Sequence, residues 1–363
     1  MKRVLFILPT LTNGGAEKVA SIIANALCTK FAVDFLLLEN DNKECYFLNE
    51  NIAIKNLGVR ISHRGNKFLT VCAFFRSFLK QYIGVKSALK ILKPDVVVSF
   101  LPKADLFAYL FKNKIGYKWI SSERNDPTVR NAVERNVLEI IYRRCDTFVC
   151  QSSVVARYYE KRRVKNCIVI PNPICNLEEN KIENVPYDDY MVAVGRFNEQ
   201  KNYSLLVNAY SDALKEMSFK TKLVIVGDGP LWDNIKALIT EKNLLEKVIL
   251  LGRKNNVNDY LKKAKFFVLT SNYEGMPNVL IEAMSAGLPV VSTDFFTGVA
   301  RELISDENGV VVPVGDRLEL KKALLKMVGK KEEELKMMGT LGRKHLKHMD
   351  KESVCGLWEK IFA

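Results

Sequence analysis

Residues 266–293 read FFVLTSNYEGMPNVLIEAMSAGLPVVST and contain one complete strand–helix–strand unit. Two short apolar runs, Phe266–Leu269 and Pro289–Ser292, flank a segment with helical spacing at Val279–Ala286. Strands that are apolar along their whole length and are joined by a crossover helix are typical of parallel sheets covered by helices on both faces. The stretch therefore predicts an α/β fold with parallel strands.

The same alternation of strands and helices extends in both directions from this unit. Ten further apolar runs are predicted as strands: Val4–Leu8, Val33–Leu38, Val96–Phe100, Trp119–Ser122, Thr147–Cys150, Cys167–Ile170, Met191–Val194, Leu223–Val226, Val248–Leu251 and Val310–Val312. Twelve strands are too many for one sheet, and the polar stretch Pro171–Tyr190 separates them into two groups. We predict two Rossmann-like, doubly wound domains, residues 1–170 and 171–346, that face a central cleft. The C-terminal helix, about residues 347–363, is expected to pack back on the first domain.

The composition excludes several classes of protein. With 363 residues, 48% hydrophobic and 26% charged, the chain is neither disordered nor collagen-like. No apolar run approaches the ~20 residues that a membrane-spanning helix needs, and the run Val4–Pro9 ends too soon for a signal peptide. The eight cysteines form no C-x-x-C pair, which favours buried thiols over disulfides or zinc ligands. We expect a cytoplasmic protein.

Positive charge is concentrated in the first half of the chain. Of the net charge of +14, all is carried by residues 1–170, which contain 28 Lys and Arg against 14 Asp and Glu. The segment Arg60–Lys93 has eight cations, no carboxylate, and apolar residues near helical spacing. A basic amphipathic helix of this kind suits an anionic membrane surface. A helix packed on the core with a solvated cationic face is the alternative, and no nucleic-acid recognition motif is present, so we expect no nucleic-acid partner.

The loop Gly195–Asn202, GRFNEQKN, follows the predicted strand Met191–Val194. Arg196 and Lys201 lie five residues apart in it, so both side chains can reach one diphosphate, Arg as a fork and Lys as a point charge. Such a pair can neutralise a departing nucleotide diphosphate as a metal ion would. The sequence has no D-x-D flanked by apolar residues, which favours a site without metal. Two solvated surface cations are the alternative.

Gly14 and Gly15 follow the first predicted strand and open a helix, where the backbone N–H groups favour an anion. A tight strand-to-helix turn is the alternative interpretation. The residues match neither G-x-G-x-x-G nor G-K-[ST], so a nicotinamide site and a P-loop are excluded.

Two later loops also follow strands. Gly227, Asp228 and Gly229 allow the backbone to approach a ligand closely, with a simple turn as the alternative. Arg253 and Asn256 lie in the loop after the next strand, where a nucleobase could rest.

Two glutamates separated by seven residues lie in the stretch Ser271–Ala283. Glu274 is in a loop, where its carboxylate can reach sugar hydroxyls, and Glu282 is on the following helix, where it can hold both hydroxyls of a ribose. The intervening residues at the helix N-terminus, whose backbone is predicted to face the same ligand, are Gly275, Met276, Pro277 and Asn278. A surface glutamate on the helix is the alternative.

Taken in order, Gly14-Gly15, Arg196…Lys201, Gly227–Pro230, Glu274-x7-Glu282 and Gly287–Val291 resemble the motifs of glycosyltransferase family 4. The resemblance covers essentially the whole chain. It implies a retaining, nucleotide-sugar-dependent enzyme with the GT-B fold. It also implies that Arg196 and Lys201 grip the donor diphosphate, Glu282 holds the ribose, Glu274 contacts the donor sugar, and Gly14 and Gly15 line the phosphate and acceptor side.

The segment Ser121–Asn125 resembles the acceptor-side segment of the family, where many members carry a histidine. Here Glu123 and Arg124 stand in that segment, and the three histidines, residues 63, 345 and 348, lie in no strand-end loop. Glu123 and Arg124 are therefore the acceptor-side candidates, and a histidine-assisted step is not expected.

The resemblance implies a hexosyltransferase that extends a lipid-linked oligosaccharide in bacterial surface-glycan biosynthesis, such as O-antigen or capsule. The donor is expected to be an N-acetylhexosamine on UDP rather than GDP, with no metal or other cofactor. The enzyme is expected to be peripheral at the inner face of the cytoplasmic membrane and to react by front-side displacement, in which the departing phosphate takes the acceptor proton. The alternatives are a nucleotide-sugar epimerase or phosphorylase of the same fold, and a non-catalytic membrane-binding scaffold.

Overall fold

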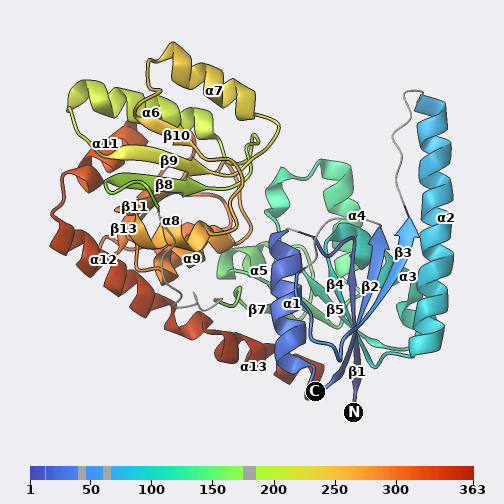
Figure 1. Cartoon of the computed structure of the whole chain (residues 1–363). Helices are drawn as coiled ribbons and strands as arrows, with labels where there is room; N and C mark the ends of the chain where they lie inside the picture. The colour runs from blue at the N-terminus through green and yellow to red at the C-terminus, as the bar shows by residue number, and fades with distance from the viewer. Residues whose placement is uncertain (13, 40–45, 60–66, 175–184) are drawn as a thin grey trace. The chain divides into compact units, whose positions relative to one another are not determined.

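A computed structural model of the chain describes residues 1–12, 14–39, 46–59, 67–174 and 185–363, and the side chains of all of these except 67–72. The chain divides into two compact units (Figure 1). Unit 1 comprises Met1–Pro173 and Lys351–Ala363, and unit 2 comprises Ile174–Asp350. The predicted borders, after residues 170 and 346, lie within four residues of these positions. Each unit is built around a parallel sheet.

The sheet of unit 1 has seven parallel strands in the order β3-β2-β1-β4-β5-β6-β7. Its strands are β1 Arg3–Leu8, β2 Ala32–Glu39, β3 Ala53–Val59, β4 Val96–Phe100, β5 Lys118–Ser122, β6 Thr147–Cys150 and β7 Cys167–Val169. All but β3 were predicted. Strand β3, AIKNLGV, lies at the edge of the sheet with most of its residues exposed, so it carries no apolar run that would identify it.

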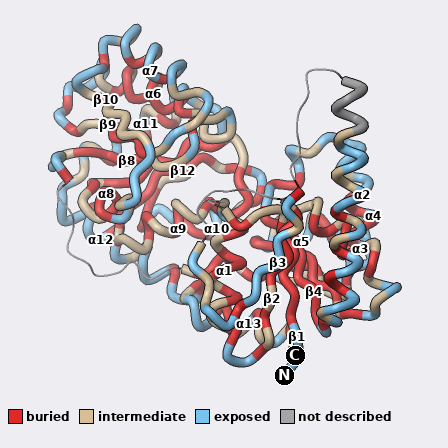
Figure 2. Tube along the Cα trace, turned by 45° about the vertical axis from the view of Figure 1, so that its right-hand side comes forward, coloured by how far each residue is buried: buried red, intermediate tan, exposed pale blue. Residues whose placement is uncertain are grey.

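Helices cover both faces of this sheet. On one face, α1 Gly15–Leu27 and α13 Lys351–Phe362 share a core with the strands. On the other face, the core contains residues of α2 Lys67–Leu92, α3 Pro102–Ile115, α4 Ala132–Tyr142 and α5 Ser153–Glu160. Figure 2 shows the buried strands between these layers. The C-terminal helix α13 therefore belongs to unit 1, although unit 2 precedes it in the chain.

The sheet of unit 2 has six parallel strands in the order β10-β9-β8-β11-β12-β13. These are β8 Tyr190–Val194, β9 Lys222–Val226, β10 Val248–Leu250, β11 Phe266–Leu269, β12 Val290–Thr293 and β13 Gly309–Val312. The helices are α6 Tyr203–Glu216, α7 Trp232–Glu241, α8 Val257–Lys263, α9 Asn278–Ser285, α10 Val299–Leu303, α11 Arg317–Val328 and α12 Glu332–His345. All strands predicted for this half are present.

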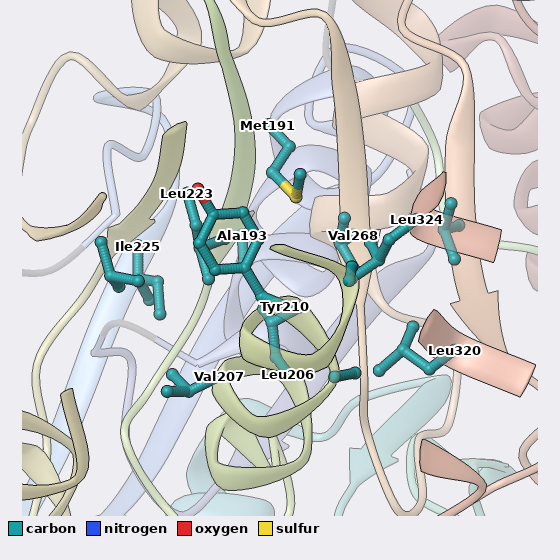
Figure 3. Close-up of a cluster of buried hydrophobic side chains, with 14 of the residues drawn as sticks. Met191, Ala193, Leu206, Val207, Tyr210, Leu223, Ile225, Val268, Leu320 and Leu324 are labelled. Atoms are coloured by element: carbon teal, nitrogen blue, oxygen red, sulfur yellow. The ribbon is translucent and has the colours of Figure 1, made fainter. Parts of the chain in front are cut away.

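Two cores stabilise unit 2, one on each face of its sheet. On one face, Leu206 and Tyr210 of α6 and Leu320 and Leu324 of α11 pack against the strands (Figure 3). The hydroxyl of buried Tyr210 donates to the carbonyl of Thr221 at 2.8 Å, so its polar atom is satisfied. The opposite core contains residues of α8, α9 and α10. In the described parts of both units, no helix is both long and apolar enough to cross a membrane.

Trp358 attaches the last helix to unit 1. It is fully buried and stacks on Phe100 with ring centroids 6.1 Å apart. We expect Trp358→Ala to lower the free energy of unfolding by about 3–5 kcal/mol, because it leaves a large cavity between α13 and the sheet. Urea denaturation followed by circular dichroism measures this. The neighbouring Leu357, 36% exposed, supplies the control Leu357→Ala, which should change stability by less than about 1 kcal/mol. Equal midpoints for the two variants would contradict the assignment of Trp358 to the core.

Candidate active site

The predicted donor residues lie in loops at one edge of the sheet of unit 2. Strands β9, β8 and β11 are neighbours and run parallel, so the loops that follow them lie at the same carboxyl edge. These loops are Gly195–Asn202 after β8, Gly227–Pro230 after β9 and Thr270–Pro277 after β11. Ligands of open parallel sheets bind at this edge.

Lys201 and Glu274, 73 residues apart in sequence, form an ion pair between two of these loops. The Nζ of Lys201 lies 2.6 Å from Oε1 of Glu274, and the two side chains are only 13% and 9% exposed. The hydroxyl of Ser271 donates to the same oxygen at 2.7 Å, and Nε2 of Gln200 donates to Oε2 at 3.2 Å. Both oxygens of the Glu274 carboxylate are therefore occupied by donors.

Further hydrogen bonds, from backbone and side chains, join the same two loops. The amide N–H of Asn272 donates to the carbonyl of Gln200 at 2.7 Å, and the hydroxyl of Thr270 donates to the carbonyl of Lys201 at 2.9 Å. Nδ2 of Asn202 donates to Oδ1 of Asn272 at 2.9 Å. These bonds fix the backbone on both sides of the Lys201–Glu274 pair.

The glycines after β8 and β9 allow these loops to touch backbone to backbone. A Cβ atom on Gly227 would lie 1.9 Å from the carbonyl oxygen of Gly195, and one on Gly229 would lie 2.5 Å from that of Phe197. The neighbouring loop therefore already requires glycine at positions 227 and 229, and the close approach of a ligand there stays a prediction. The side chain of Asp228, between them, is exposed.

Arg196 begins the same loop as Lys201 and has a different environment. Its side chain is exposed, and its guanidinium has no hydrogen-bond or ion-pair partner within the part of the chain that the structure describes. The aliphatic part of Lys201 passes over Gly195, where a Cβ atom would be 2.8 Å from Cε of the lysine. The loop therefore presents one free cation and one paired cation.

The other predicted donor residues lie nearby in the chain. Gly275, Met276 and Pro277 are buried before α9, and the carbonyl of Gly275 accepts a bond from the hydroxyl of Thr297 at 2.9 Å. Asn278 is the first residue of α9, and Glu282 lies one turn further along this helix, half-buried.

Arg253 and Asn256, for which the sequence predicts a nucleobase contact, lie in the loop after β10, and that contact stays a prediction. Arg253 is exposed, and Nδ2 of Asn256 donates to Oδ2 of Asp259 at 3.2 Å, at the start of α8. Asn256 thus bonds within its own turn.

A small pocket lies beside the Gly195–Asn202 loop, with a volume of about 120 Å³. Its lining includes Phe197, Glu199, Tyr203 and Asn234, but none of Arg196, Lys201 and Glu274. Sites that bind small molecules and cofactors typically occupy about 300–1,000 Å³. The pocket is therefore too small and wrongly lined to be the donor site.

In unit 1, the predicted acceptor residue Glu123 is fully engaged in an internal network. Its carboxylate accepts bonds from Nη1 and Nη2 of Arg130 at 2.6 and 2.8 Å, from the hydroxyl of Tyr159 at 2.6 Å, and from two backbone N–H groups. Burial alone would raise the pKa of Glu123, but the Arg130 charge and these hydrogen bonds hold it below its usual range. The carboxylate is ionised and fixes the segment after β5.

Arg124 is buried beside two aromatic rings. Its Cζ lies 5.0 Å from the ring centre of Phe100 and 5.7 Å from that of Trp358, and its Nη1 donates to Oδ1 of Asn172 at 2.8 Å. Nε and Nη2 have no partner among the described residues, and burial lowers the pKa of the guanidinium to about 9. Arg124 therefore links the end of β5 to the C-terminal helix.

At the start of α1, the space beside Gly14 is filled by a side chain of the same helix. A Cβ atom on Gly14 would lie 2.0 Å from Oε2 of Glu17, and the hydroxyl of Thr10 donates to Oε1 of Glu17 at 3.3 Å. Gly15 follows as the first residue of α1 and is exposed. The carboxylate of Glu17 thus lies at the helix N-terminus, where the sequence predicts an external anion.

Sequence reasoning missed the residues that hold the site together. Gln200 bonds to Glu274 from a loop 74 residues away, which no local pattern reveals. Ser271 and Arg130 lie three and seven residues from the glutamates that they bond, but neither belongs to a motif that singles it out.

The buried Asp105 has no sequence signal either. On α3, it accepts bonds from the hydroxyls of Ser99 at 2.6 Å and Ser121 at 2.8 Å. Burial raises its pKa to about 7, against the lowering effect of the two serine hydrogen bonds.

Known families and proteins resemble both halves of the chain. Residues 13–175 match the family model described as Glycosyltransferase Family 4, and residues 177–345 match that of Glycosyl transferases group 1. An α-1,4-N-acetyl-D-galactosaminyltransferase of Campylobacter jejuni, named for the acceptor GalNAc-α-(1→4)-GalNAc-α-(1→3)-diNAcBac-PP-undecaprenol, is 30% identical over 329 residues. The alignment covers 89% of this chain and 88% of that relative.

Solved structures resemble the whole chain at low sequence identity. Sucrose-phosphate synthase from Thermosynechococcus elongatus has a TM-score of 0.83 at 18% identity, covering 100% of this chain and 98% of its own. HepE from Anabaena, solved in complex with UDP-glucose, has a TM-score of 0.77 at 17% identity and covers 99% of each chain. The predicted GT-B fold is confirmed by this likeness and by the two parallel sheets.

The raised pKa of Asp105 predicts a pH-dependent stability. Because the folded state holds the Asp105 proton up to about pH 7 and the unfolded chain releases it near 3.8, this group makes stability fall as the pH rises from about 4 to 7. Asp105→Asn cannot titrate, so its melting temperature relative to wild type should rise between pH 5 and pH 8. Differential scanning fluorimetry measures this, with exposed Asp233→Asn as the control for loss of a carboxylate. A constant offset for Asp105→Asn at all pH values would refute the prediction.

Proposed function

Because the chain belongs to glycosyltransferase family 4, we propose that it transfers a sugar from a nucleotide diphosphate sugar to a lipid-linked saccharide. The observation that carries the proposal is the contact between Lys201 and Glu274, with the unpaired Arg196 in the same strand-end loop. These are the residue types that a diphosphate and a sugar require, a point charge, a guanidinium fork and a hydrogen-bond acceptor.

In this proposal the donor binds at the carboxyl edge of the sheet of unit 2. Arg196 and Lys201 hold the diphosphate, Glu274 accepts bonds from the sugar hydroxyls, and Glu282 on α9 holds the ribose. A UDP donor is supported by HepE, which has the same fold and was solved with UDP-glucose. An N-acetylhexosamine as the sugar is supported by the Campylobacter jejuni relative, which is named as an N-acetylgalactosaminyltransferase.

The proposed reaction retains the anomeric configuration. The bond between the anomeric carbon and the donor phosphate oxygen breaks, and the acceptor oxygen bonds to the same face of that carbon. The departing phosphate oxygen takes the proton of the acceptor hydroxyl. Arg196 and Lys201 stabilise the negative charge that develops on the diphosphate, in place of a metal ion. Because both oxygens of Glu274 are held by donors, this carboxylate is better placed to orient groups than to attack carbon.

The acceptor in this proposal is a saccharide on a polyprenyl diphosphate, the type of molecule for which the Campylobacter jejuni relative is named. The reaction would belong to the assembly of bacterial surface glycans. The enzyme would then work at the inner face of the cytoplasmic membrane, where such a lipid presents its saccharide.

Helix α2 is the proposed membrane contact. Arg60 and Arg64 of the predicted basic segment lie outside the described residues, as does the side chain of Lys67. The described apolar residues of α2 lie on two faces of the helix, one buried and one exposed. Phe78, Tyr82, Val85, Leu89 and Leu92 pack toward the sheet of unit 1.

The second face of α2 points to solvent. Phe75, Leu79 and Ile83, four residues apart, are 68%, 48% and 59% exposed. Exposed Lys86 and Lys90 continue the same line along the helix. An exposed apolar stripe followed by cations suits insertion among acyl chains beside anionic headgroups.

The donor site predicts strong effects of removing either cation. Arg196→Ala and Lys201→Ala should each lower transfer to a polyprenyl-diphosphate-linked acceptor by at least about 10²-fold, because each loses about 3 kcal/mol of charge stabilisation in the transition state. Lys236→Ala, which removes an exposed lysine of α7, should transfer sugar at the wild-type rate. Wild-type rates for both Arg196→Ala and Lys201→Ala would disprove the assignment.

Product analysis in the same assay separates the rival activities. Free epimerised sugar indicates an epimerase, and a sugar phosphate indicates a phosphorylase. A scaffold would show no rise in melting temperature with UDP or GDP, whereas a donor site predicts one.

The outer face of α2 predicts binding to anionic membranes. The triple variant Phe75→Ser, Leu79→Ser, Ile83→Ser should bind vesicles of phosphatidylglycerol and phosphatidylcholine at least about tenfold more weakly in co-sedimentation, because it loses three exposed apolar side chains. Its fold should persist, since none of the three is buried. Leu245→Ser, Leu318→Ser, Met337→Ser, three equally exposed residues of unit 2, is the matched control and should bind like wild type. If wild type bound pure phosphatidylcholine vesicles as tightly as vesicles that contain phosphatidylglycerol, this would argue against an electrostatic contribution to binding.

A further inference from the structure

The Lys201–Glu274 pair places a negative charge beside the proposed diphosphate site. Lys201 Nζ is bonded to Glu274 Oε1 at 2.6 Å, and Ser271 and Gln200 hold the carboxylate in that position. A phosphate oxygen bonded to the same ammonium at about 2.8 Å would lie within roughly 5.5 Å of Glu274 Oε1. At this distance, in a site where both side chains are almost buried, two negative charges repel each other strongly.

The net charge of the Lys201–Glu274 pair does not offset this repulsion. Lys201 and Glu274 neutralise each other, so the pair offers little net attraction to a diphosphate. Arg196, whose guanidinium has no partner among the residues described, is the cation that remains to attract it. The phosphates of a bare nucleoside diphosphate therefore face a carboxylate to which their ionised oxygens offer no hydrogen-bond donor.

A nucleotide sugar interacts with the Glu274 carboxylate more favourably than a free nucleoside diphosphate does. Its hydroxyl groups can donate to Glu274, whose Oε2 accepts, from the described residues, the single long 3.2 Å bond of Gln200. It also carries less charge, because the terminal phosphate of the free diphosphate bears an additional ionisable oxygen. Breaking the bond between sugar and phosphate gives the electron pair to that oxygen, which takes the proton of the acceptor hydroxyl. The charge beside Glu274 therefore increases when the product diphosphate loses this proton.

We propose that Glu274 is the specificity-determining residue that makes this site bind the nucleotide sugar in preference to the free nucleoside diphosphate, and so promotes release of the diphosphate product. Lys201 is shared between Glu274 and the phosphate. Ser271 and Gln200 are positioning residues, because they prevent the carboxylate from turning away. This inference rests on the proposed function, in which Lys201 and Glu274 both face the donor.

The test is the affinity of the purified full-length chain for UDP, measured by isothermal titration calorimetry. Glu274→Gln keeps the shape of the side chain and removes its charge, so it should bind UDP at least about tenfold more tightly than wild type. Its affinity for a UDP-N-acetylhexosamine should not increase in parallel. The matched control is Glu199→Gln, which removes an exposed carboxylate from the same loop and should leave the UDP affinity unchanged.

A second measurement distinguishes the effect of the Glu274 charge from a local packing defect caused by the substitution. Lys201→Ala leaves the Glu274 charge uncompensated and should bind UDP much more weakly than wild type. Adding Glu274→Gln to Lys201→Ala should then restore at least about tenfold of the lost affinity, whereas a merely structural role for the pair predicts further loss.

The outcomes separate the inference from the function on which it rests. Equal or weaker UDP binding by folded Glu274→Gln, together with no rescue of Lys201→Ala, overturns the role of Glu274 while leaving the donor site in place. Absence of UDP, GDP and inorganic diphosphate binding in wild type and in every variant overturns both.

Discussion

The buried ion pair between Lys201 and Glu274 imposes the main constraint on the candidate site. Removing two charges from water is costly, and a buried pair is tolerated only when its geometry is good and its remaining atoms are hydrogen-bonded. Ser271 and Gln200 meet this condition for the carboxylate. Their positions are in turn fixed by bonds between the two loop backbones and by the glycine contacts that bring the loops after β8 and β9 together. The precision of the site thus comes from close packing of backbone at the sheet edge.

Unit 1 uses a related arrangement at the carboxyl end of β5. Glu123 is neutralised by Arg130, and Arg124 lies beside the rings of Phe100 and Trp358. Because Trp358 belongs to α13, the last helix of the chain supports the segment that the family resemblance associates with the acceptor. Glu123 has no oxygen left to act as a base, so its contribution is to hold this segment in place.

Helix α2 shows how one helix can serve two environments. Its inner residues complete the core of unit 1, and Tyr82 packs on Phe111 of α3 at 4.8 Å between ring centroids. Its outer residues contribute apolar surface and cations that the core does not need. The positive charge of the chain lies in residues 1–170, whereas the proposed donor site lies in unit 2, where acidic and basic residues balance. The proposed division between a unit that contacts the membrane and a unit that binds the donor agrees with this distribution.

Much of this molecule was determined by its sequence alone. The twelve apolar runs became strands because burial on both faces of a parallel sheet leaves a continuous apolar signal, and only the exposed edge strand β3 escaped it. The order of motifs identified the family, and the positions of Arg196, Lys201, Glu274 and Glu282 at strand ends and on α9 followed from that order. The tertiary structure decided which side chains touch. The contacts of Lys201 with Glu274 and of Gly227 with Gly195 depend on strand order and loop packing, because each joins separate segments whose spacing along the chain carries no information about their separation in space. The pairing of Glu123 with Arg130, seven residues later, depends on the path of the chain after β5.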